Sequence, residues 1–316
     1  MTGAAPAIDR DWLASVFADF DLGDPTVIER FDGGSAAVYR VERRNDLPVV
    51  LKVYNDLSQE DVGKETYAAS LLSTAGIPIT RFLACDTSRV RAPFRYAVTN
   101  YLPGMPVMAY AGEPDRADLY RQMGSILRQL HGVRLPAFGR FGPDGIIDPV
   151  DTNIAFIRRL WDAVLHEFRH YGAAAKFADK LDAIVFARIG IAEFGSGAVF
   201  AHDDFQPNNV LAERDDAGKL RLTGLVDFGN ARAADATFDL AKALFCCEHD
   251  APGSTPALLE GYGIIDHPEP DSALWFYGLI HRVTMWYWLR RIGVIPDGER
   301  HDLIEQLETM SEQKQP

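Results

Sequence analysis

Apolar residues recur at two different spacings along the chain, and the change in spacing separates a strand-rich first part from a helix-rich second part. In residues 9–20 the side chains of Trp12, Leu13, Val16 and Phe17 fall on one helical face, which predicts a short amphipathic helix. Apolar runs bounded by turn-forming residues then predict about five strands. These runs are residues 27–31, a segment ending at Val41, and residues 48–54, 79–84 and 94–101.

From residue 115 onward the apolar residues follow helical spacing. One helix is predicted from Leu119, Met123, Ile126, Leu127 and Leu130. Further helices are predicted over residues 152–171, 174–192 and 273–292, and a loop rich in Gly, Pro and Asp is predicted over residues 135–151. The pattern therefore predicts an α+β chain whose strands come first and whose helices follow.

A short hairpin is predicted in the second part, flanked by polar residues. Residues 210–213 and 220–226 have strand character, and the polar segment 214–219 between them contains a glycine. A hairpin returns the chain on itself, so Asn209 before the first strand and Asp227 after the second should lie close together. An amide oxygen and a carboxylate are suitable ligands for Mg²⁺. Taken alone, however, an Asp-Phe-Gly such as that at Asp227 is far more often a simple turn.

Asp204 precedes Asn209 by five residues on the same predicted loop. From there its carboxylate can face an incoming hydroxyl group while Asn209 and Asp227 hold a metal ion. One Asp as base and an Asn with a second Asp on the metal form the residue pattern of phosphoryl transfer.

Lys52 is unusual because it lies inside the apolar run 48–54. A buried ammonium group is costly unless a negative group meets it. The predicted helix over residues 59–75 offers Glu60 and Glu65 as partners. The alternative is that Lys52 lies on an edge strand and faces solvent.

Composition narrows the class of protein. The chain has 316 residues, of which 47% are hydrophobic and 24% charged, so it can build a large core without disulfides. The three cysteines lack C-x-x-C spacing and are expected to be reduced core thiols. A net charge of −13 disfavours a nucleic-acid surface and is compatible with a cationic substrate. No signal peptide or membrane span is recognisable, so a cytoplasmic location is expected.

Two segments carry a family resemblance. Residues 202–209 read HDDFQPNN and residues 225–231 read LVDFGNA. Together they resemble the catalytic segment of the aminoglycoside phosphotransferase and choline kinase group, a small-molecule branch of the protein-kinase-like fold, and the aminoglycoside phosphotransferase-like family in particular. Protein kinases have Arg before the catalytic Asp and Lys two residues after it. This chain has Asp203 and Gln206 there, which favours the small-molecule branch.

The resemblance implies a two-lobed kinase-like fold. Its parts would be an N-lobe over residues 1–100 with an antiparallel sheet of about five strands, a hinge over residues 101–104, and a mostly helical C-lobe over residues 105–316. In the hinge region the carbonyl of Asn100 and the N–H of Leu102 would bind adenine. Asp239 would start a helix and brace the catalytic loop, together with His202.

The resemblance also implies roles for the nucleotide-binding residues. The turn at Gly33, Gly34 and Ser35 would cover the phosphates of the nucleotide. Lys52 would hold those phosphates, paired with Glu65, which has the spacing from Gly76-Ile77-Pro78 that the family shows.

The expected activity is transfer of the γ-phosphoryl group of ATP or GTP, with Mg²⁺, to a hydroxyl group of a small acceptor. Aminoglycoside-like antibiotics, amino alcohols, hydroxy-amino acids and sugars all remain open as acceptors. The rival hypothesis is a catalytically silent nucleotide-binding protein. Such a protein usually lacks the lysine, the base or a metal ligand, whereas Lys52, Asp204, Asn209 and Asp227 are all present here.

Overall fold

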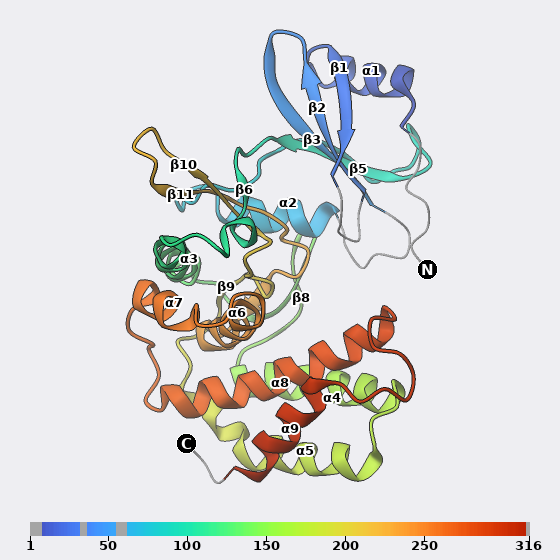
Figure 1. Cartoon of the computed structure of the whole chain (residues 1–316). Coiled ribbons are helices and arrows are strands. Elements are labelled where there is room, and N and C mark those ends of the chain that lie inside the picture. Colours follow the sequence, from blue (N-terminus) through green and yellow to red (C-terminus); the bar gives the residue numbers. More distant parts are fainter. Residues whose placement is uncertain (1–7, 32–36, 55–61, 314–316) are drawn as a thin grey trace. The chain divides into compact units, whose positions relative to one another are not determined.

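The computed structural model describes residues 8–31, 37–54 and 62–313, which form two compact units. The first unit comprises residues 1–119, 141–145 and 207–231, and the second comprises residues 120–140, 146–206 and 232–316. Figure 1 shows the elements of both units. The first unit thus includes the segment around Asn209 and Asp227, which lies far along the chain from the other strands of that unit.

The first unit contains the predicted five-stranded sheet. Its strands are β1 (Pro25–Arg30), β2 (Ala37–Arg43), β3 (Asp46–Tyr54), β4 (Phe82–Asp86) and β5 (Arg95–Asn100). Their order in the sheet is β1-β2-β3-β5-β4, and every neighbouring pair is antiparallel. β3 is therefore a central strand. The predicted antiparallel sheet is confirmed.

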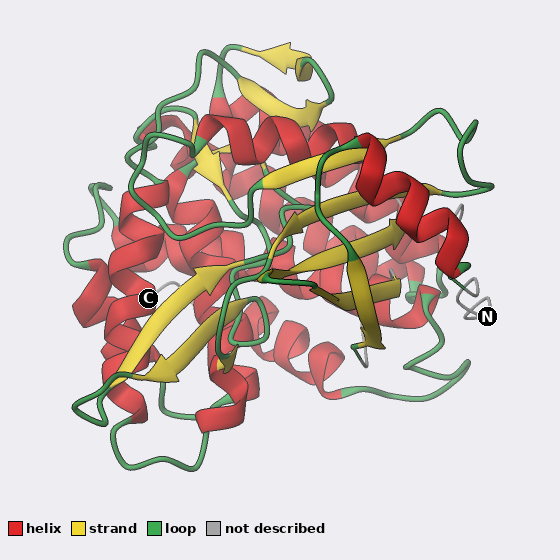
Figure 2. Cartoon of the chain, turned by 90° about the horizontal axis from the view of Figure 1, so that it is seen from above, coloured by secondary structure: helices red, strands yellow, loops and turns green. Residues whose placement is uncertain are grey.

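Two helices pack on opposite faces of this sheet. α1 (Arg10–Asp19) begins after Asp9, whose carboxylate accepts the N–H groups of Asp11 and Trp12. Its apolar side chains share a core with Val49, Leu51 and Val53 of β3, and Figure 2 shows α1 lying across the sheet. α2 (Val62–Leu71) packs on the other face through Val62, Tyr54 and Ala97. Because successive residues of a strand point to opposite faces, the alternation in β3 directs Lys52 toward α2.

The predicted hairpin is also present in the first unit. β10 (Val210–Arg214) pairs antiparallel with β11 (Leu220–Leu225), and β6 (Met105–Pro106) adds a third strand. The prediction that Ile79 begins a sheet strand is wrong. β4 starts only at Phe82, and Ile79 instead forms a bridge with Leu225 of β11.

The second unit contains a four-stranded sheet that the sequence did not predict. Its strands are β7 (Phe138–Gly142), β8 (Gly145–Val150), β9 (Val199–Ala201) and β12 (Arg232–Ala234), in the order β8-β7-β12-β9. The predicted loop over residues 135–151 is therefore wrong. β12 pairs with both β7 and β9, and partners so distant in sequence leave no local signal in a glycine-rich segment.

Helices make up most of the second unit. They are α3 (Arg116–Leu130), α4 (Asn153–His170), α5 (Ala175–Arg188), α6 (Ala236–Asp250), α7 (Thr255–Tyr262), α8 (Pro270–Arg291) and α9 (Asp302–Glu312). Of the two short 3₁₀ helices, Val107–Tyr110 belongs to the first unit and Ile189–Phe194 to the second. α8 packs against α4, α6 and α9. The helix predicted over 174–192 ends at Arg188 and continues as the second 3₁₀ helix.

The three cysteines differ in their exposure to solvent. Cys246 and Cys247 are buried free thiols as expected, but Cys85 is exposed, which corrects the expectation of three core cysteines.

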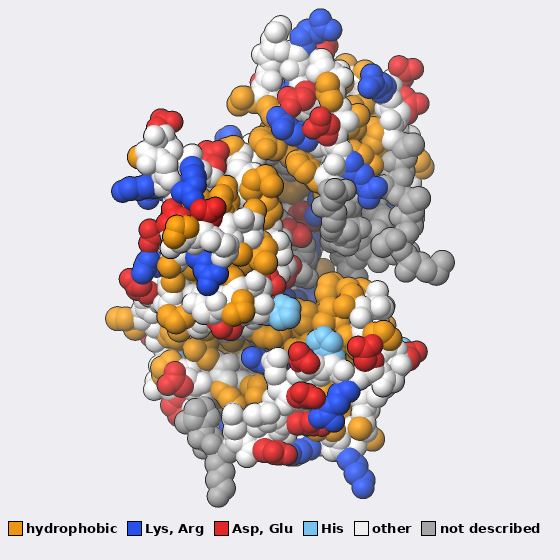
Figure 3. All heavy atoms as spheres, viewed as in Figure 1, with side chains coloured by type: hydrophobic (Ala, Val, Ile, Leu, Met, Phe, Trp, Pro, Cys, Tyr) orange, Lys and Arg blue, Asp and Glu red, His pale blue; other side chains and the backbone are white. Residues whose placement is uncertain are grey.

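On the face drawn in Figure 3, acidic and basic side chains of the described residues are interspersed, so this face does not gather the negative charge in one patch. Among the described residues, no helix is both long enough and apolar enough to span a membrane.

Gly124 permits the close approach of α3 and α7, which gives a stability prediction. A methyl group at Gly124 would lie 2.6 Å from the backbone nitrogen of Tyr262 and closer still to the carbonyl oxygen of Leu258. Gly124→Ala should therefore lower the free energy of unfolding by about 1–3 kcal/mol, measured by urea denaturation. Gly278→Ala in α8 is the control, because only the end of the Arg282 side chain, at 3.1 Å, lies near its added methyl group. Equal stability of the two variants would contradict the packing described.

Candidate active site

Lys52 and Glu65 form a buried ion pair in the first unit. The ammonium nitrogen lies 2.9 Å from Oε1 of Glu65, and the side chains are 16% and 5% exposed. The alternative of a solvent-facing lysine on an edge strand is excluded, since β3 is central in the sheet. Glu60, the other partner considered, lies outside the described residues. The pair is fixed by the alternation of β3 and by the position of Glu65 in the first turn of α2.

The hairpin brings Asn209 next to the segment that contains Asp227. Val210 pairs with Leu225, and the N–H of Val226 donates to the carbonyl of Asn209 at 3.0 Å. Asp227 has a φ of 65°, in the left-handed region that residues other than glycine rarely adopt. Its Oδ1 lies 3.7 Å from the Lys52 ammonium and accepts the Gly229 N–H at 3.3 Å. Lys52, Glu65 and Asp227 thus form one charged cluster in this unit.

The side chains around Asp227 suit a hard metal ion that takes most of its ligands from elsewhere. Asn209 is buried, and the Asp227 side chain is 42% exposed. In the part of the chain that the structure describes, no group of three or more His, Cys, Asp or Glu residues is arranged to hold a metal. One amide oxygen and one carboxylate fit Mg²⁺, which usually keeps waters and phosphate oxygens as its other ligands, and do not fit a structural zinc.

In the second unit, Asp239 holds the loop that contains Asp204. The Asp239 carboxylate accepts the N–H of His202 at 2.7 Å and that of Asp203 at 2.8 Å, and all three residues are buried. The helix α6 starts one turn earlier than the sequence suggested, because its N-cap is Asp235. Asp239 therefore lies in the first turn of α6, where the backbone N–H groups also favour a negative charge.

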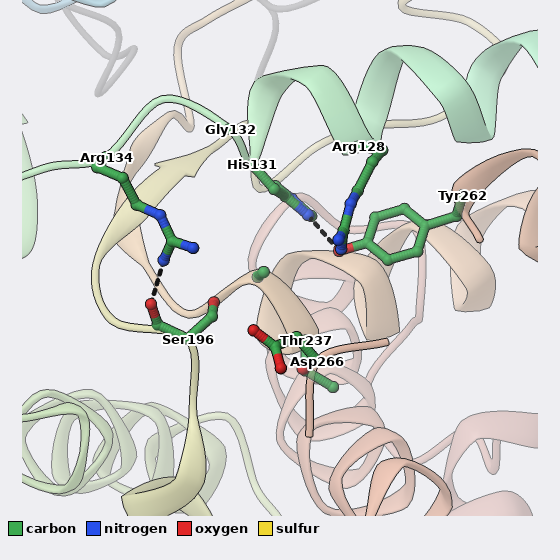
Figure 4. A pocket seen from close by; sticks show the side chains of 9 residues that line it. Arg128, His131, Gly132, Arg134, Ser196, Thr237, Tyr262 and Asp266 are labelled. Carbon is green, nitrogen blue, oxygen red and sulfur yellow. Dashed lines mark hydrogen bonds between the residues drawn. The ribbon is translucent and has the colours of Figure 1, made fainter. Parts of the chain in front are cut away.

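His131, at the end of α3, takes part in this network. Its Nε2 lies 3.1 Å from Oδ2 of Asp239, and its Nδ1 lies 2.8 Å from the hydroxyl of Tyr262. Figure 4 shows the ring at the end of α3 directed at Tyr262. Burial by itself raises the pKa of Asp239, but the hydrogen bond and charge of His131 lower it by more, so the pKa lies below its usual value.

Asp203 is buried between two cations. Its φ is 52°, another left-handed conformation that has to be stabilised by its surroundings. Its carboxylate lies 2.6 Å from Arg232 and 3.4 Å from Lys242. Burial acts to raise the pKa of Asp203, but the two cations lower it by more. Asp203 is therefore held as a carboxylate at neutral pH.

Asp204 is the more accessible of the two neighbouring aspartates, with a side chain 20% exposed. The Gln206 amide donates to its Oδ2 at 3.4 Å, and the Lys242 ammonium lies 3.8 Å from its Oδ1. Asp204 belongs to the second unit, whereas Asn209 and Asp227 belong to the first. A carboxylate with one accessible edge and a fixed orientation can accept a proton from a bound hydroxyl group.

The remaining predicted residues concern the nucleotide. Gly33, Gly34 and Ser35 lie outside the described residues. Asn100 ends β5, donates its N–H to the Arg81 carbonyl at 3.1 Å and accepts the Arg81 N–H on its side chain at 2.6 Å. Leu102 packs on Gly224, where an added methyl group would lie 2.6 Å from Leu102 Cδ1. The adenine-binding roles of Asn100 and Leu102 stay predictions.

Three residues of this network carried no signal that sequence reasoning used. His131 contacts Asp239, whereas Arg232 and Lys242 contact Asp203. The three residues come from different elements, and their contacts are formed only by the tertiary fold. The one local clue is that Lys242 follows Asp239 by three residues, which places both on the same side of α6.

A pocket opens beside His131, the residue that contacts Asp239. It offers about 100 Å³ to water-sized molecules and is lined by Arg128, Arg134, Thr237 and Asp266, among others. Figure 4 shows that the arginines point into it from the end of α3 and the segment after it, and Arg134 donates to the Ser196 carbonyl. Since none of the predicted site residues lines this pocket, it is separate from the candidate site.

The hydrogen bonds to Asp239 predict an effect on stability that depends on pH. A native pKa below the unfolded value means that the stabilisation is complete above about pH 4 and is lost as the pH falls further. Asp239→Asn should lower the free energy of unfolding by about 2–4 kcal/mol at pH 7, measured by urea denaturation, and should flatten its decline below about pH 4. Asp216→Asn, at an exposed position, is the control. An unchanged acid dependence in Asp239→Asn would contradict this role.

Comparisons with known proteins show the family and the fold. The sequence profile of the phosphotransferase enzyme family matches residues 27–276. The aminoglycoside 3'-phosphotransferase of Streptomyces fradiae is 28% identical over 237 residues, which cover 70% of this chain and 78% of the relative.

Solved structures share the fold. A thermostable mutant of aminoglycoside phosphotransferase APH(4)-Ia has a TM-score of 0.66 at 17% identity, over 96% of both chains. A choline/ethanolamine kinase family protein from Mesorhizobium loti has a TM-score of 0.60 at 17% identity, over 90% of this chain and 86% of that one. The expected α+β kinase-like fold is thereby confirmed. The chain belongs to the phosphotransferase enzyme family and is a small-molecule phosphotransferase that acts on hydroxyl groups.

Proposed function

We propose that this phosphotransferase transfers the γ-phosphoryl group of ATP or GTP to a hydroxyl group of a small cationic acceptor. The observation that carries the proposal is the charged cluster of Lys52, Glu65 and Asp227, which lie on a central strand, on the buried side of α2 and at the end of a hairpin. A buried lysine whose ammonium has carboxylates on two sides is already oriented to meet phosphate oxygens. The aspartate loop of the second unit supplies the residue that would act on the acceptor.

The first unit would bind the nucleotide. Lys52, held by Glu65, would contact its phosphates, and the glycine turn of Gly33 to Ser35 would cover them. The backbone of Asn100 and Leu102 would bind the base. Nucleotide use is supported by the relatives, because APH(4)-Ia variants have been crystallised with ADP and with AMP-PNP.

Asn209 and Asp227 would hold Mg²⁺, whose positive charge would compensate the charge of the phosphates. Their oxygen ligands and the exposed side of Asp227 support this assignment. The phosphates would then be held by Lys52 directly and by the Asn209–Asp227 pair through the metal. Positioning of this kind contributes most of the rate in phosphoryl transfer.

Asp204 would act on the acceptor. Its carboxylate would accept the proton of the acceptor hydroxyl as the oxygen forms a bond to the γ-phosphorus and the bond to the β-phosphate oxygen breaks. Asp239 would hold the loop in place during this step, because its carboxylate accepts the backbone N–H groups of His202 and Asp203. The loop then keeps its conformation while the Asp204 carboxylate accepts the proton.

A cationic acceptor is favoured by Asp250 at the end of α6. Its Oδ2 is buried without a hydrogen-bond partner among the described residues. Burial raises the pKa of Asp250, and the negative charge of Asp204 raises it further. Buried carboxylate oxygens usually have a partner, and an ammonium group of the acceptor would supply one. Relatives agree, because APH(4)-Ia was crystallised with hygromycin B, an aminoglycoside.

The two units predict different consequences of mutation. Asp204→Ala should lower kcat by about 10²–10⁴-fold while nucleotide affinity stays close to wild type, because only proton acceptance is removed. Lys52→Ala should weaken nucleotide binding, since it removes a phosphate contact. The measurements are ADP production and nucleotide titration calorimetry with Mg²⁺ and a panel of aminoglycosides, amino alcohols, hydroxy-amino acids and sugars. Wild-type turnover in Asp204→Ala, or wild-type nucleotide affinity in Lys52→Ala, would refute the corresponding assignment.

The buried carboxylate oxygen of Asp250 predicts that the enzyme selects cationic acceptors over neutral ones. Asp250→Asn should raise KM for cationic acceptors by about 10-fold or more, because it removes a charged hydrogen bond, and should leave KM for neutral sugars unchanged. Glu248→Gln is the matched control, since the Glu248 carboxylate is already engaged by the Gly253 N–H at 2.9 Å and the Thr255 hydroxyl at 2.7 Å. Steady-state kinetics with paired cationic and neutral acceptors check this. Equal changes in KM for both kinds of acceptor would show that Asp250 does not select a cation.

A further inference from the structure

Lys242 is a buried lysine that contacts the loop carrying Asp204. It lies on α6 three residues after Asp239, and its side chain is only 12% exposed. Its ammonium donates to the backbone carbonyl of Asp203, lies 3.4 Å from the Asp203 carboxylate and lies 3.8 Å from Oδ1 of Asp204. Burial of an ammonium group is costly, so its presence beside this loop calls for a reason.

The charges around Asp203 show that Lys242 is more than a partner for that residue. Arg232 already meets the Asp203 carboxylate at 2.6 Å. His281 also faces Asp203, but burial lowers its pKa to about 4, so it is neutral near pH 7. With Asp203 matched by Arg232, the second negative charge within reach of Lys242 is that of Asp204. Burial alone would lower the pKa of Lys242, but the carboxylates of Asp203 and Asp204 raise it by more, so the lysine stays protonated.

The contacts of Asp204 come from two sides. Lys242 approaches Oδ1, while the Gln206 amide donates to Oδ2. Lys242 is anchored by the Asp203 carbonyl and Gln206 belongs to the loop itself, so both partners are fixed to the same backbone as Asp204. With the Lys242 ammonium 3.8 Å from Oδ1 and the Gln206 amide 3.4 Å from Oδ2, both partners restrain rotation of the carboxylate about its Cβ–Cγ bond. The orientation of the edge that meets a hydroxyl group is thereby restricted.

We propose that Lys242 is a positioning residue for the proposed base Asp204. Its ammonium group fixes the orientation of the Asp204 carboxylate and keeps a positive charge beside it when the phosphates and the acceptor bind. This inference rests on the proposed function, since it requires Asp204 to be the base. Lys242 takes part in no covalent step and does not itself receive the proton.

The competing explanation is that Lys242 only stabilises the left-handed conformation of Asp203. Arg232 makes the closer ion pair with the same carboxylate, so it provides a matched control. If bracing of Asp203 were the whole role, loss of either cation would have the same effect on catalysis for the same loss of stability.

The experiment compares Lys242→Met, Lys242→Arg, Arg232→Met and Arg232→Lys. ADP release from ATP with Mg²⁺ is measured with hygromycin B, with choline and without acceptor, where water takes the phosphoryl group. Thermal unfolding is measured for each variant. Lys242→Met should lower kcat by about 10- to 100-fold with KM for nucleotide and acceptor little changed, because orientation acts on the transition state. Lys242→Arg should recover most of that loss, and Arg232→Met should lower kcat less at equal thermal destabilisation.

A double variant separates this inference from the proposal on which it rests. If Lys242 acts through Asp204, Lys242→Met added to Asp204→Asn should lower kcat no further, because effects of residues that act as a unit are not additive. If Lys242→Met does not fold, the same cycle is run with Lys242→Gln. A further loss in the double variant, or equal losses in Lys242→Met and Arg232→Met, would overturn the role of Lys242. Wild-type turnover in Asp204→Asn would instead overturn the proposed base.

Discussion

A buried carboxylate organises the second unit. Asp239 accepts the N–H groups of His202 and Asp203 at 2.7 and 2.8 Å, so the loop before Asp204 is joined to α6 by its backbone. Each unpaired buried N–H would cost about 1–3 kcal/mol, which makes any other loop conformation unfavourable. Asp239, Lys242, Cys246 and Asp250 follow one another at intervals of three and four residues, so α6 directs them along one side. The helix that fixes the loop thus also supplies Lys242 for the proposed base and Asp250 for the proposed acceptor.

In the first unit, a charged lysine is held in one position inside a sheet. The alternation of β3 directs Val49, Leu51 and Val53 into the core beneath α1 and turns Lys52 toward α2. The cost of burying the ammonium is offset by Glu65 at 2.9 Å and Asp227 at 3.7 Å. Asp227 follows a hairpin that begins at Asn209, so the hairpin brings the two proposed metal ligands to one end, and Asp227 lies beside the lysine.

Local sequence patterns were sufficient to predict much of the fold and part of the candidate site. The sheet, the hairpin and the pairing of Lys52 with Glu65 follow from alternation, turn residues and family spacing. What the sequence did not reveal depends on contacts between distant segments. β7 and β8 are extended into a four-stranded sheet by β12, which comes much later in the chain, and His131, Arg232 and Lys242 acquire their roles only by meeting Asp239 and Asp203. A buried polar residue has no periodic signature, so its partner has to be seen in the fold.

In the function proposed for this chain, Lys52, Asn209 and Asp227 bind the phosphates and metal of a nucleotide. X-ray diffraction from crystals grown with AMP-PNP and Mn²⁺ tests it most directly, because the anomalous signal of manganese locates the metal without assumptions about the acceptor. We expect one manganese peak bonded to the side-chain oxygens of Asn209 and Asp227, with the Lys52 ammonium on the nucleotide phosphates. Manganese bound by other residues, or phosphates out of reach of Lys52, would contradict it.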